Sequence, residues 1–152
     1  MLKILIPVDG SELSLDAVQH ALRLVREGLQ ASFVLANVQE PASLYEIVTA
    51  RDLQVLQGVS EGAGAHLLES AEALCKAAGV ACELEVASGD PAHTLIDIAE
   101  RFGCDAVIMG ARGRGAVRSA LLGSVSQAMA HDSAIPVTIV KHAQIDEDLE
   151  QS

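Results

Sequence analysis

Short apolar segments alternate along this chain with longer segments in which apolar residues recur every three or four positions. The first short segment, LKILIPV at 2–8, is apolar along nearly its whole length, as strands buried on both faces are. Similar segments predict four further strands, at 32–38, 81–87, 105–110 and 136–141. Strands that alternate with helices pair in parallel and are wound by right-handed crossovers. We therefore expect an α/β protein, a single-domain, doubly wound, five-stranded parallel sheet with helices on both faces.

The intervening segments carry the start and stop signals of helices. Asp9, Gly10 and Ser11 supply turn and cap chemistry before the first helix, and Asp90 with Pro91 does so before the third. Glycines predict where three of the helices end, at Gly28, Gly79 and Gly103. The predicted buried stripes are Leu15, Val18, Leu22 and Val25 in the first helix, Ala63, Leu67, Leu74 and Ala78 in the second, and Leu95, Ile98 and Phe102 in the third. A fourth helix is predicted from Ser124 to about His131.

Two segments have less regular patterns. The second helix is predicted over 58–78, while 39–57 fits either a short helix or a mobile flap over the sheet. The strand at 81–87 alternates Cys82, Leu84 and Val86 with two glutamates, which is typical of an edge strand with one wet face.

Composition restricts the compartment and the partners. With 152 residues and only 2% aromatics, the chain suits one domain whose core is built from aliphatic side chains. The net charge of −11 argues against nucleic acid and anionic membranes as partners. The chain shows neither a secretory leader nor an apolar run long enough to span a membrane, which favours the cytoplasm. Three cysteines without CxxC spacing predict buried free thiols, and five scattered histidines predict no metal site.

Positive charge is concentrated beside glycines after the fourth predicted strand. The spacing of Gly110, Gly113, Gly123 and Ser124 brings a flexible backbone to the start of a helix. The first turn of a helix presents unpaired N–H groups and a positive dipole, and Ser124 and Ser126 add hydroxyl groups there. The pattern therefore predicts a phosphate site, to which Arg112, Arg114 and Arg118 are candidate contributors. The alternative is that the glycines serve only tight turns and the arginines only a solvated loop.

The predicted topology brings a second loop to the same place. If the first strand is central and the strand ending at Gly110 is its neighbour, the loops at 7–11 and 110–124 face each other beyond the carboxyl ends of the strands. Asp9 would then face the crevice and could hold a ribose hydroxyl or a cation, although simple turn chemistry also explains an aspartate there.

Other sequence signatures point to no alternative chemistry. The chain contains neither a P-loop nor a GxGxxG fingerprint after a strand. GVSEG at 58–62 matches the GxSxG motif of serine hydrolases, but the segment before it does not have the pattern of a buried strand.

Five segments of the chain together resemble the universal stress protein A family. The resemblance rests on ILIPVDGSELS, GDPAHTLIDIAE, DAVIMGARGRG, LLGSVSQAMAH and IPVTIV, and it covers residues 2–141. The glycine and serine spacing is similar to that of the ATP-binding members. The resemblance implies a Rossmann-like fold of the adenine nucleotide alpha hydrolase type. It places a universal stress protein domain at 1–142 and leaves an acidic tail at 143–152.

The resemblance also implies a set of ligand contacts. Pro7, Val8 and Asp9 correspond to the segment around the adenosine, and Val38 to the residue whose backbone meets adenine. Met109 and Gly110 match the floor under the nucleoside. Gly113, Gly123, Ser124, Val125 and Ser126 match the triphosphate cradle, with Arg112 beside them. The implied cofactor is ATP, with Mg²⁺ or Mn²⁺ accompanying the phosphates.

The implied function is that of a cytoplasmic, ATP-binding regulatory module in the stress response. The family forms homodimers by pairing the last strand, here 136–140, across a two-fold axis. Asn37 departs from the family, which often has histidine there, and 41–57 has no trusted counterpart. Two alternatives stay open: an enzyme that cleaves ATP slowly, for which no catalytic base is assignable, and a structural dimer without ligand.

Overall fold

The computed structural model describes residues 1–40, 50–112 and 122–141, and within the second helix it describes side chains from Gly64 onward. Five strands alternate with four helices in this part of the chain. The elements in order are β1 (Leu2–Pro7), α1 (Glu12–Arg26), β2 (Ala31–Gln39), α2 (Ala50–Ala77), β3 (Cys82–Ser88), α3 (Pro91–Phe102), β4 (Ala106–Gly110), α4 (Ser124–Asp132) and β5 (Val137–Val140). The predicted alternation is confirmed.

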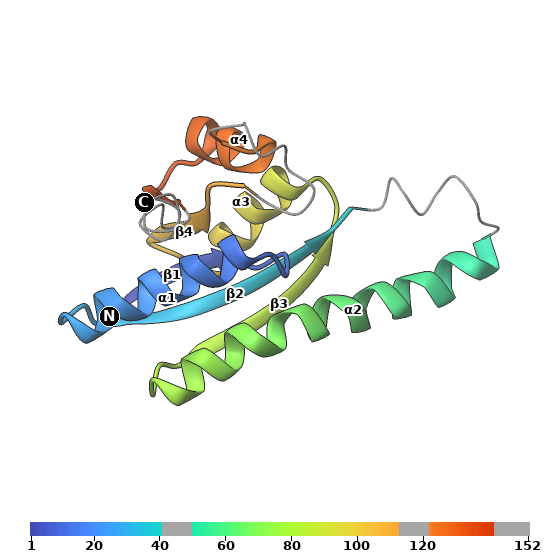
Figure 1. Ribbon diagram of the computed structural model, residues 1–152. Helices are drawn as coiled ribbons and strands as arrows, with labels where there is room; N and C mark the ends of the chain where they lie inside the picture. The colour runs from blue at the N-terminus through green and yellow to red at the C-terminus, as the bar shows by residue number, and fades with distance from the viewer. Residues whose placement is uncertain (41–49, 113–121, 142–152) are drawn as a thin grey trace, which may run out of the picture.

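The five strands form one parallel sheet in the order β3-β2-β1-β4-β5. The first strand is therefore central, with β2 on one side and β4 on the other, which meets the condition on which the expected crevice depended. Its register pairs Ile4 with Phe33 of β2 and with Ala106 of β4. Helices lie on both faces of the sheet, with α1 and α2 on one face and α3 and α4 on the other (Figure 1).

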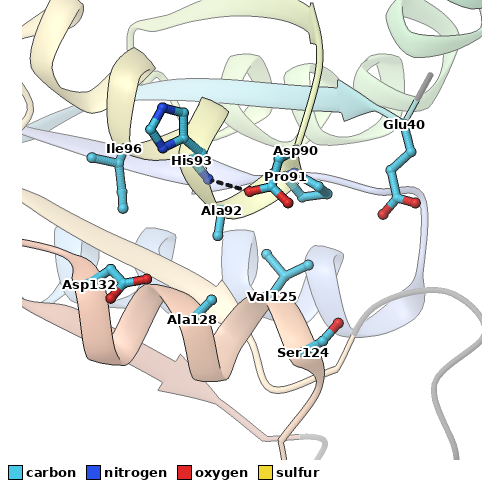
Figure 2. A pocket seen from close by; sticks show the side chains of 10 residues that line it. All are labelled: Glu40, Asp90, Pro91, Ala92, His93, Ile96, Ser124, Val125, Ala128 and Asp132. Carbon is cyan, nitrogen blue, oxygen red and sulfur yellow. Dashed lines mark hydrogen bonds between the residues drawn. The ribbon is translucent and has the colours of Figure 1, made fainter. Parts of the chain in front are cut away.

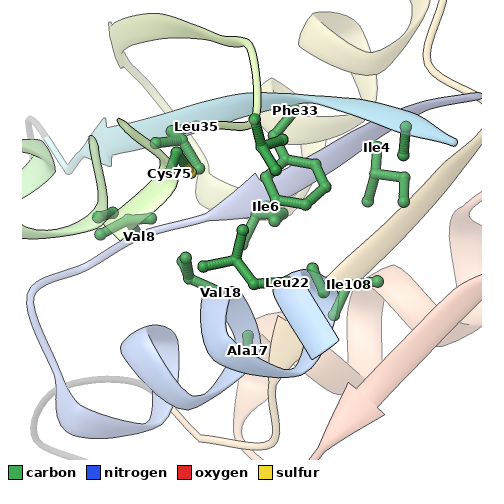
Figure 3. Close-up of a cluster of buried hydrophobic side chains, with 14 of the residues drawn as sticks. Ile4, Ile6, Val8, Ala17, Val18, Leu22, Phe33, Leu35, Cys75 and Ile108 are labelled. Carbon is green, nitrogen blue, oxygen red and sulfur yellow. The ribbon is translucent and has the colours of Figure 1, made fainter. Parts of the chain in front are cut away.

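Two hydrophobic clusters, one on each face, hold the helices to the sheet. On the α1 and α2 face, Ile4, Ile6, Phe33 and Leu35 of the strands pack against helix residues such as Val18 (Figure 3). On the other face, the strands present Leu5, Val34, Val107 and Met109 to side chains of α3 and α4. Successive residues of a strand point to opposite faces, so each central strand supplies both clusters.

Predicted capping residues set the ends of α1 and α3. The Ser11 hydroxyl accepts a hydrogen bond from Ser14 N–H at 3.2 Å, and the Asp90 carboxylate accepts one from His93 N–H at 3.0 Å. Gly103, with φ of 66°, ends α3 in the left-handed conformation. In both helices the predicted stripes face the sheet and are buried or partly buried.

The sequence-based prediction for α2 needs two corrections. The helix begins at Ala50 rather than near Gly58, so of the two alternatives left open for 39–57 the helical one holds over 50–57, while 41–49 lies outside the described residues. Among the residues whose side chains are described, the buried ones are Gly64, Leu68, Ala71 and Cys75, whereas Leu67 and Leu74 of the predicted stripe are half-buried and Ala78 is exposed. Gly64 fixes this rotation, because a Cβ there would lie 2.7 Å from Val86 and 2.8 Å from the Asn37 amide oxygen. Ala63 lies outside the residues whose side chains are described.

The strand β3 is an edge of the sheet, as predicted. Its residues do not alternate cleanly between a buried face and an exposed face. Leu84 is 43% exposed, while Cys82 and Val86 pack partly against the core. Among the described residues, we find no helix with the length and apolar character needed to cross a membrane.

Candidate functional site

The crevice expected from the topology lies where β1 and β4 end side by side. The chain leaves β1 toward α1 on one face, and it leaves β4 toward α4 on the other. Departures to opposite faces open a crevice at the carboxyl ends of the two strands, which is the usual ligand position in such sheets. Pro7 and Gly110 are the last residues of these strands.

Asn37 is a functional candidate that the sequence did not single out for a role. It is 2% exposed, and its amide nitrogen donates to the Val8 carbonyl at 2.8 Å. Its amide oxygen accepts a hydrogen bond from Gln39. The Val8 N–H in turn donates to Ala36 at 2.7 Å. Both backbone polar groups of Val8, just after β1, are thus hydrogen-bonded. The sequence signals for Asn37 were a polar residue in an apolar strand and its departure from the histidine that the family often has there.

Asp9 takes part in the turn that starts α1. Its Oδ1 accepts a hydrogen bond from the Ser11 backbone N–H at 2.8 Å. This contact is the turn chemistry that the sequence offered as an alternative to ligand binding. The Asp9 side chain is also half-buried at the crevice.

Gly110 has a packing reason to be glycine. A Cβ on Gly110 would lie 2.9 Å from the Leu13 backbone oxygen and 3.0 Å from its carbonyl carbon. Backbone atoms cannot swing aside as a flexible side chain can. The absence of a side chain at Gly110 therefore brings α1 close to the end of β4 and narrows the crevice.

The Ala111 carbonyl joins the end of β4 to the start of α4 through hydrogen bonds. It accepts hydrogen bonds from Gly123 N–H at 2.7 Å and from the Ser126 hydroxyl at 2.6 Å. The Ala111 N–H donates to Val140 of β5 at 2.9 Å. The start of α4 is thereby tied to the carboxyl ends of β4 and β5, and the buried Ser126 hydroxyl has an internal partner.

The N-terminus of α4 differs from those of α1 and α3. Its N-cap is Gly123, so no side chain accepts hydrogen bonds from the first-turn N–H groups. Ser11 and Asp90 perform that task in the other two helices. Gly123 has φ of −75° and ψ of 169°, a conformation open to any residue, so backbone strain does not require glycine there. The first-turn N–H groups of α4 are thus available to an external acceptor.

A pocket of about 400 Å³ lies between the starts of α3 and α4 (Figure 2). Its walls are apolar, since Val125 and Ala128 of α4 point toward Ala92 and Ile96 of α3. Its polar groups are mainly acidic and are contributed by Glu40, Asp90 and Asp132, together with His93 and Ser124. Asp132 also contacts His131 at 2.8 Å, and this hydrogen bond raises the pKa of His131.

The structure brings many of the predicted ligand contacts to one end of the sheet. Ser124 and Val125 line the pocket, and Val38 lies two residues before Glu40, which also lines it. Met109 is buried in β4 and pairs with Ile139, so its side chain packs in the core below the crevice. Arg112 is half-buried and follows Ala111 directly. Gly113, Arg114 and Arg118 lie outside the described residues.

The part of the chain that the structure describes provides no ready-made metal cage. No three His, Cys, Asp or Glu side chains come together there in a way that could hold an ion. The segment 58–62 lies within α2 rather than between a strand and a helix, so the context of a serine hydrolase motif is absent.

Comparisons with known proteins agree with this architecture. The model of the universal stress protein family matches residues 1–141. The universal stress protein YxiE of Bacillus subtilis is 31% identical over 146 residues, which cover 91% of this chain and 98% of that one. The solved structure of hypothetical protein MJ0577 has a TM-score of 0.80 at 26% identity, covering 93% of this chain and 96% of that one. A universal stress protein solved in complex with cAMP has a TM-score of 0.63 at 25% identity and covers 92% and 96%. This chain belongs to the universal stress protein family.

Proposed function

We propose that the protein binds ATP in the crevice between β1 and β4 and acts as a nucleotide-dependent regulatory module of the stress response. The observation that carries this proposal is the uncapped N-terminus of α4, tied to the end of β4 through the Ala111 carbonyl. The cAMP complex of a related protein supports an adenine nucleotide as the ligand class.

The phosphates fit the end of the crevice at α4. Backbone N–H groups of Ser124, Val125 and Ser126 are in the first turn, where an anion gains from both hydrogen bonds and the helix dipole. Arg112 is the described cation nearest in sequence to this turn across the loop. We place the triphosphate here, with Gly113 completing the cradle.

We place the adenosine at the other side of the crevice, with Val8, Asp9 and Val38 at the nucleoside. The pocket adjoins the phosphate end, because Ser124 and Val125 of α4 line it. Its apolar walls suit a flat ring, and the carboxylates of Glu40 and Asp90 are acceptors for an amino group.

Mg²⁺ or Mn²⁺ accompanies ATP in this proposal but needs no cage made by the protein alone. Magnesium keeps several water ligands and is commonly held by substrate phosphates with one or two carboxylates. Asp9, half-buried at the crevice, stays at the nucleoside in this proposal, so no carboxylate of the protein is assigned to the ion.

The regulatory form is a homodimer in this proposal, paired through β5. This strand lies at an edge of the sheet, and it is only four residues long with Thr138 exposed. An edge strand has backbone groups that a second copy can pair. Dimerisation places the two α4 N-termini in one assembly, where nucleotide occupancy can change a shared surface.

The test is a calorimetric titration of refolded, ligand-free protein with ATP and Mg²⁺. Gly123→Val is expected to lose at least tenfold in affinity (about 1.4 kcal/mol), because a branched side chain would stand at the cradle. Ala130→Val is the matched control, since Ala130 is exposed on the same helix and the same side chain is introduced. Circular dichroism confirms the fold of each variant.

Four outcomes separate the alternatives. Binding lost in Gly123→Val and kept in Ala130→Val supports the cradle. Equal binding in both variants contradicts the site. Release of phosphate from ATP that is also lost in Gly123→Val favours the slow ATPase, and the absence of binding in any form favours a structural dimer without ligand.

A further inference from the structure

Cys75 and Cys82 lie beside each other at the junction between α2 and β3. Cys75 is in the last turn of α2, and Cys82 is the first residue of β3. The chain reverses between them through Gly79, which has φ of 72°. The Val80 N–H donates to the Cys75 carbonyl at 3.0 Å and closes this turn. The reversal carries Cys82 back alongside the helix end.

The two thiols share one environment. Cys82 packs against the hydrophobic cluster that contains Cys75, and each thiol affects the pKa of the other. Cys104 belongs to the cluster on the opposite face of the sheet, so it is not a third member of the pair. All three cysteines are free thiols.

The two thiols differ in exposure. Cys75 is fully buried, whereas Cys82 is partly exposed on an edge strand. The sequence predicted three buried thiols, and Cys82 departs from this because β3 has no strand on its outer side among the described elements. A small reagent can therefore reach Cys82 first, and Cys75 only by way of Cys82.

Exposure decides which thiol reacts first. Burial raises the pKa of the Cys75 thiol to about 12. Burial raises the pKa of Cys82 too and Glu72 adds to this, while the hydrogen bond with Cys75 and the charge of Lys76 act against it. Cys82 therefore needs alkaline solution to supply the thiolate that attacks a disulfide.

We propose that Cys75 and Cys82 form a redox-active dithiol, which small disulfide compounds oxidise to an intramolecular disulfide. In the first step the Cys82 thiolate attacks one sulfur of the compound, forms a mixed disulfide and releases one thiolate. In the second step Cys75 attacks the Cys82 sulfur, the bond to the compound breaks, and the departing thiolate takes the proton of Cys75. The dithiol loses two electrons and two protons, and the disulfide compound becomes two thiols.

The product joins the end of α2 to the start of β3 covalently. The redox state of the two thiols thereby affects how firmly the end of α2 is held against β3. The proposal does not depend on the nucleotide site, which lies at the opposite, carboxyl ends of the strands.

The experiment uses oxidised glutathione as the probe on the folded chain with Cys104→Ser, so that only two thiols remain. We expect both thiols to be lost together, with a mass decrease of two hydrogen atoms and no retained glutathione. Cys75→Ser should instead accumulate a stable glutathione adduct on Cys82. Cys82→Ser should stay unreacted, because Cys75 is buried. The reaction should accelerate with rising pH as Cys82 ionises.

A second measurement keeps the test decisive if a variant does not fold. The unmodified chain is treated with phenylarsine oxide, a probe that requires two adjacent thiols, and the modified residues are identified by peptide mapping. We expect one arsenic bridging Cys75 and Cys82. A glutathione adduct that persists on Cys82 in the unmodified chain would overturn the proposal, as would a folded chain that reacts with neither probe or one that forms only disulfides between chains.

Discussion

Gly110 and Gly123 stand at the two ends of one loop and differ in what surrounds them. At Gly110 a side chain would meet the backbone of Leu13, so glycine is explained by packing. At Gly123 the backbone conformation accepts any residue, and the helix start lacks a side-chain cap. Gly110 therefore allows α1 to pack close to β4 at the crevice, and Gly123 leaves the first-turn N–H groups of α4 available to a ligand.

Gly110→Ala should destabilise the fold by about 1–3 kcal/mol, because the added methyl group overpacks against α1. Urea unfolding measures the difference, and Ala106→Gly provides the reverse change within the same strand. If Gly110→Ala leaves the free energy of unfolding unchanged, the close approach of α1 to β4 is not as the structure describes.

Gly123→Ser should have opposite effects on stability and on binding. A serine at the N-cap accepts a hydrogen bond from the first turn, which should stabilise the fold by a few tenths of a kcal/mol. The same bond competes with phosphate for the N–H groups, so ATP affinity should fall. Thermal unfolding and calorimetry on one preparation measure both, and a serine variant that binds ATP more tightly would contradict the proposed cradle.

Cys75 predicts a loss of stability in alkaline solution. Its thiol has an ordinary pKa of 9.0, whereas burial raises the folded-state pKa to about 12. An acid with a raised folded pKa contributes stability that is complete below 9.0 and disappears as the pH rises toward 12. The slope attributable to Cys75 is at most about 1.4 kcal/mol per pH unit. The pH dependence of unfolding in Cys75→Ser, which cannot ionise, should be flatter by this amount.

At the scale of elements, α2 shows how packing overrides a local preference. Glycine weakens an isolated helix by about 1 kcal/mol relative to alanine. Gly64 nevertheless lies inside α2, where its backbone packs closely against the side chains of Asn37 and Val86. The close approach that glycine permits sets both the rotation and the depth of the helix.

Gly64→Ala should therefore destabilise the protein by about 1 kcal/mol, although the same change usually strengthens a helix. The matched control is Ser70→Ala, an exposed position of the same helix that should become slightly more stable. Urea unfolding compares the two. A stabilised Gly64→Ala variant would mean that α2 does not approach β2 and β3 so closely.

The same helix marks the limit of prediction from sequence. Caps and stops at Ser11, Asp90 and Gly103 act within a few residues, so α1 and α3 were predicted closely. The face of α2 depends on contacts with β2 and β3, which lie far away in sequence. The roles of Asn37 and Ala111 were missed for the same reason, since hydrogen bonds to Val8 and Gly123 follow only from the fold. The position of the crevice could be predicted only on the condition that β1 is central, because the alternation of elements does not fix the order of the strands.

At the scale of the whole molecule, the two edges of the sheet are unlike. The edge at β3 carries Glu83 and Glu85, with Lys3 and Arg101 in ion pairs to them. The edge at β5 has partly buried aliphatic side chains, and its four residues are uncharged. Charges discourage pairing with another chain, so β5 is the edge that suits a second copy.

Thr138→Lys should convert the proposed dimer to a monomer without unfolding it. Thr138 is exposed at β5, and lysine at an edge strand opposes pairing by charge and by the cost of desolvation. Sedimentation velocity measures the mass in solution. Gln19→Lys, an exposed position on α1, is the control and should leave the mass unchanged. A dimer that persists in Thr138→Lys would place the interface elsewhere.

The central position of β1 has a consequence for how the chain folds during synthesis. The ribosome delivers β1, β2 and β3 first, and these three strands pair with one another within the first 88 residues. The other side of β1 must wait for β4, whose first residue is Ala106. Until then the side of β1 that later pairs with β4, at Ile4 and Leu5, has no partner strand. A nascent chain that has released only β1, β2 and β3 can therefore form no more than half of the sheet, and the crevice requires β4 to pair with β1.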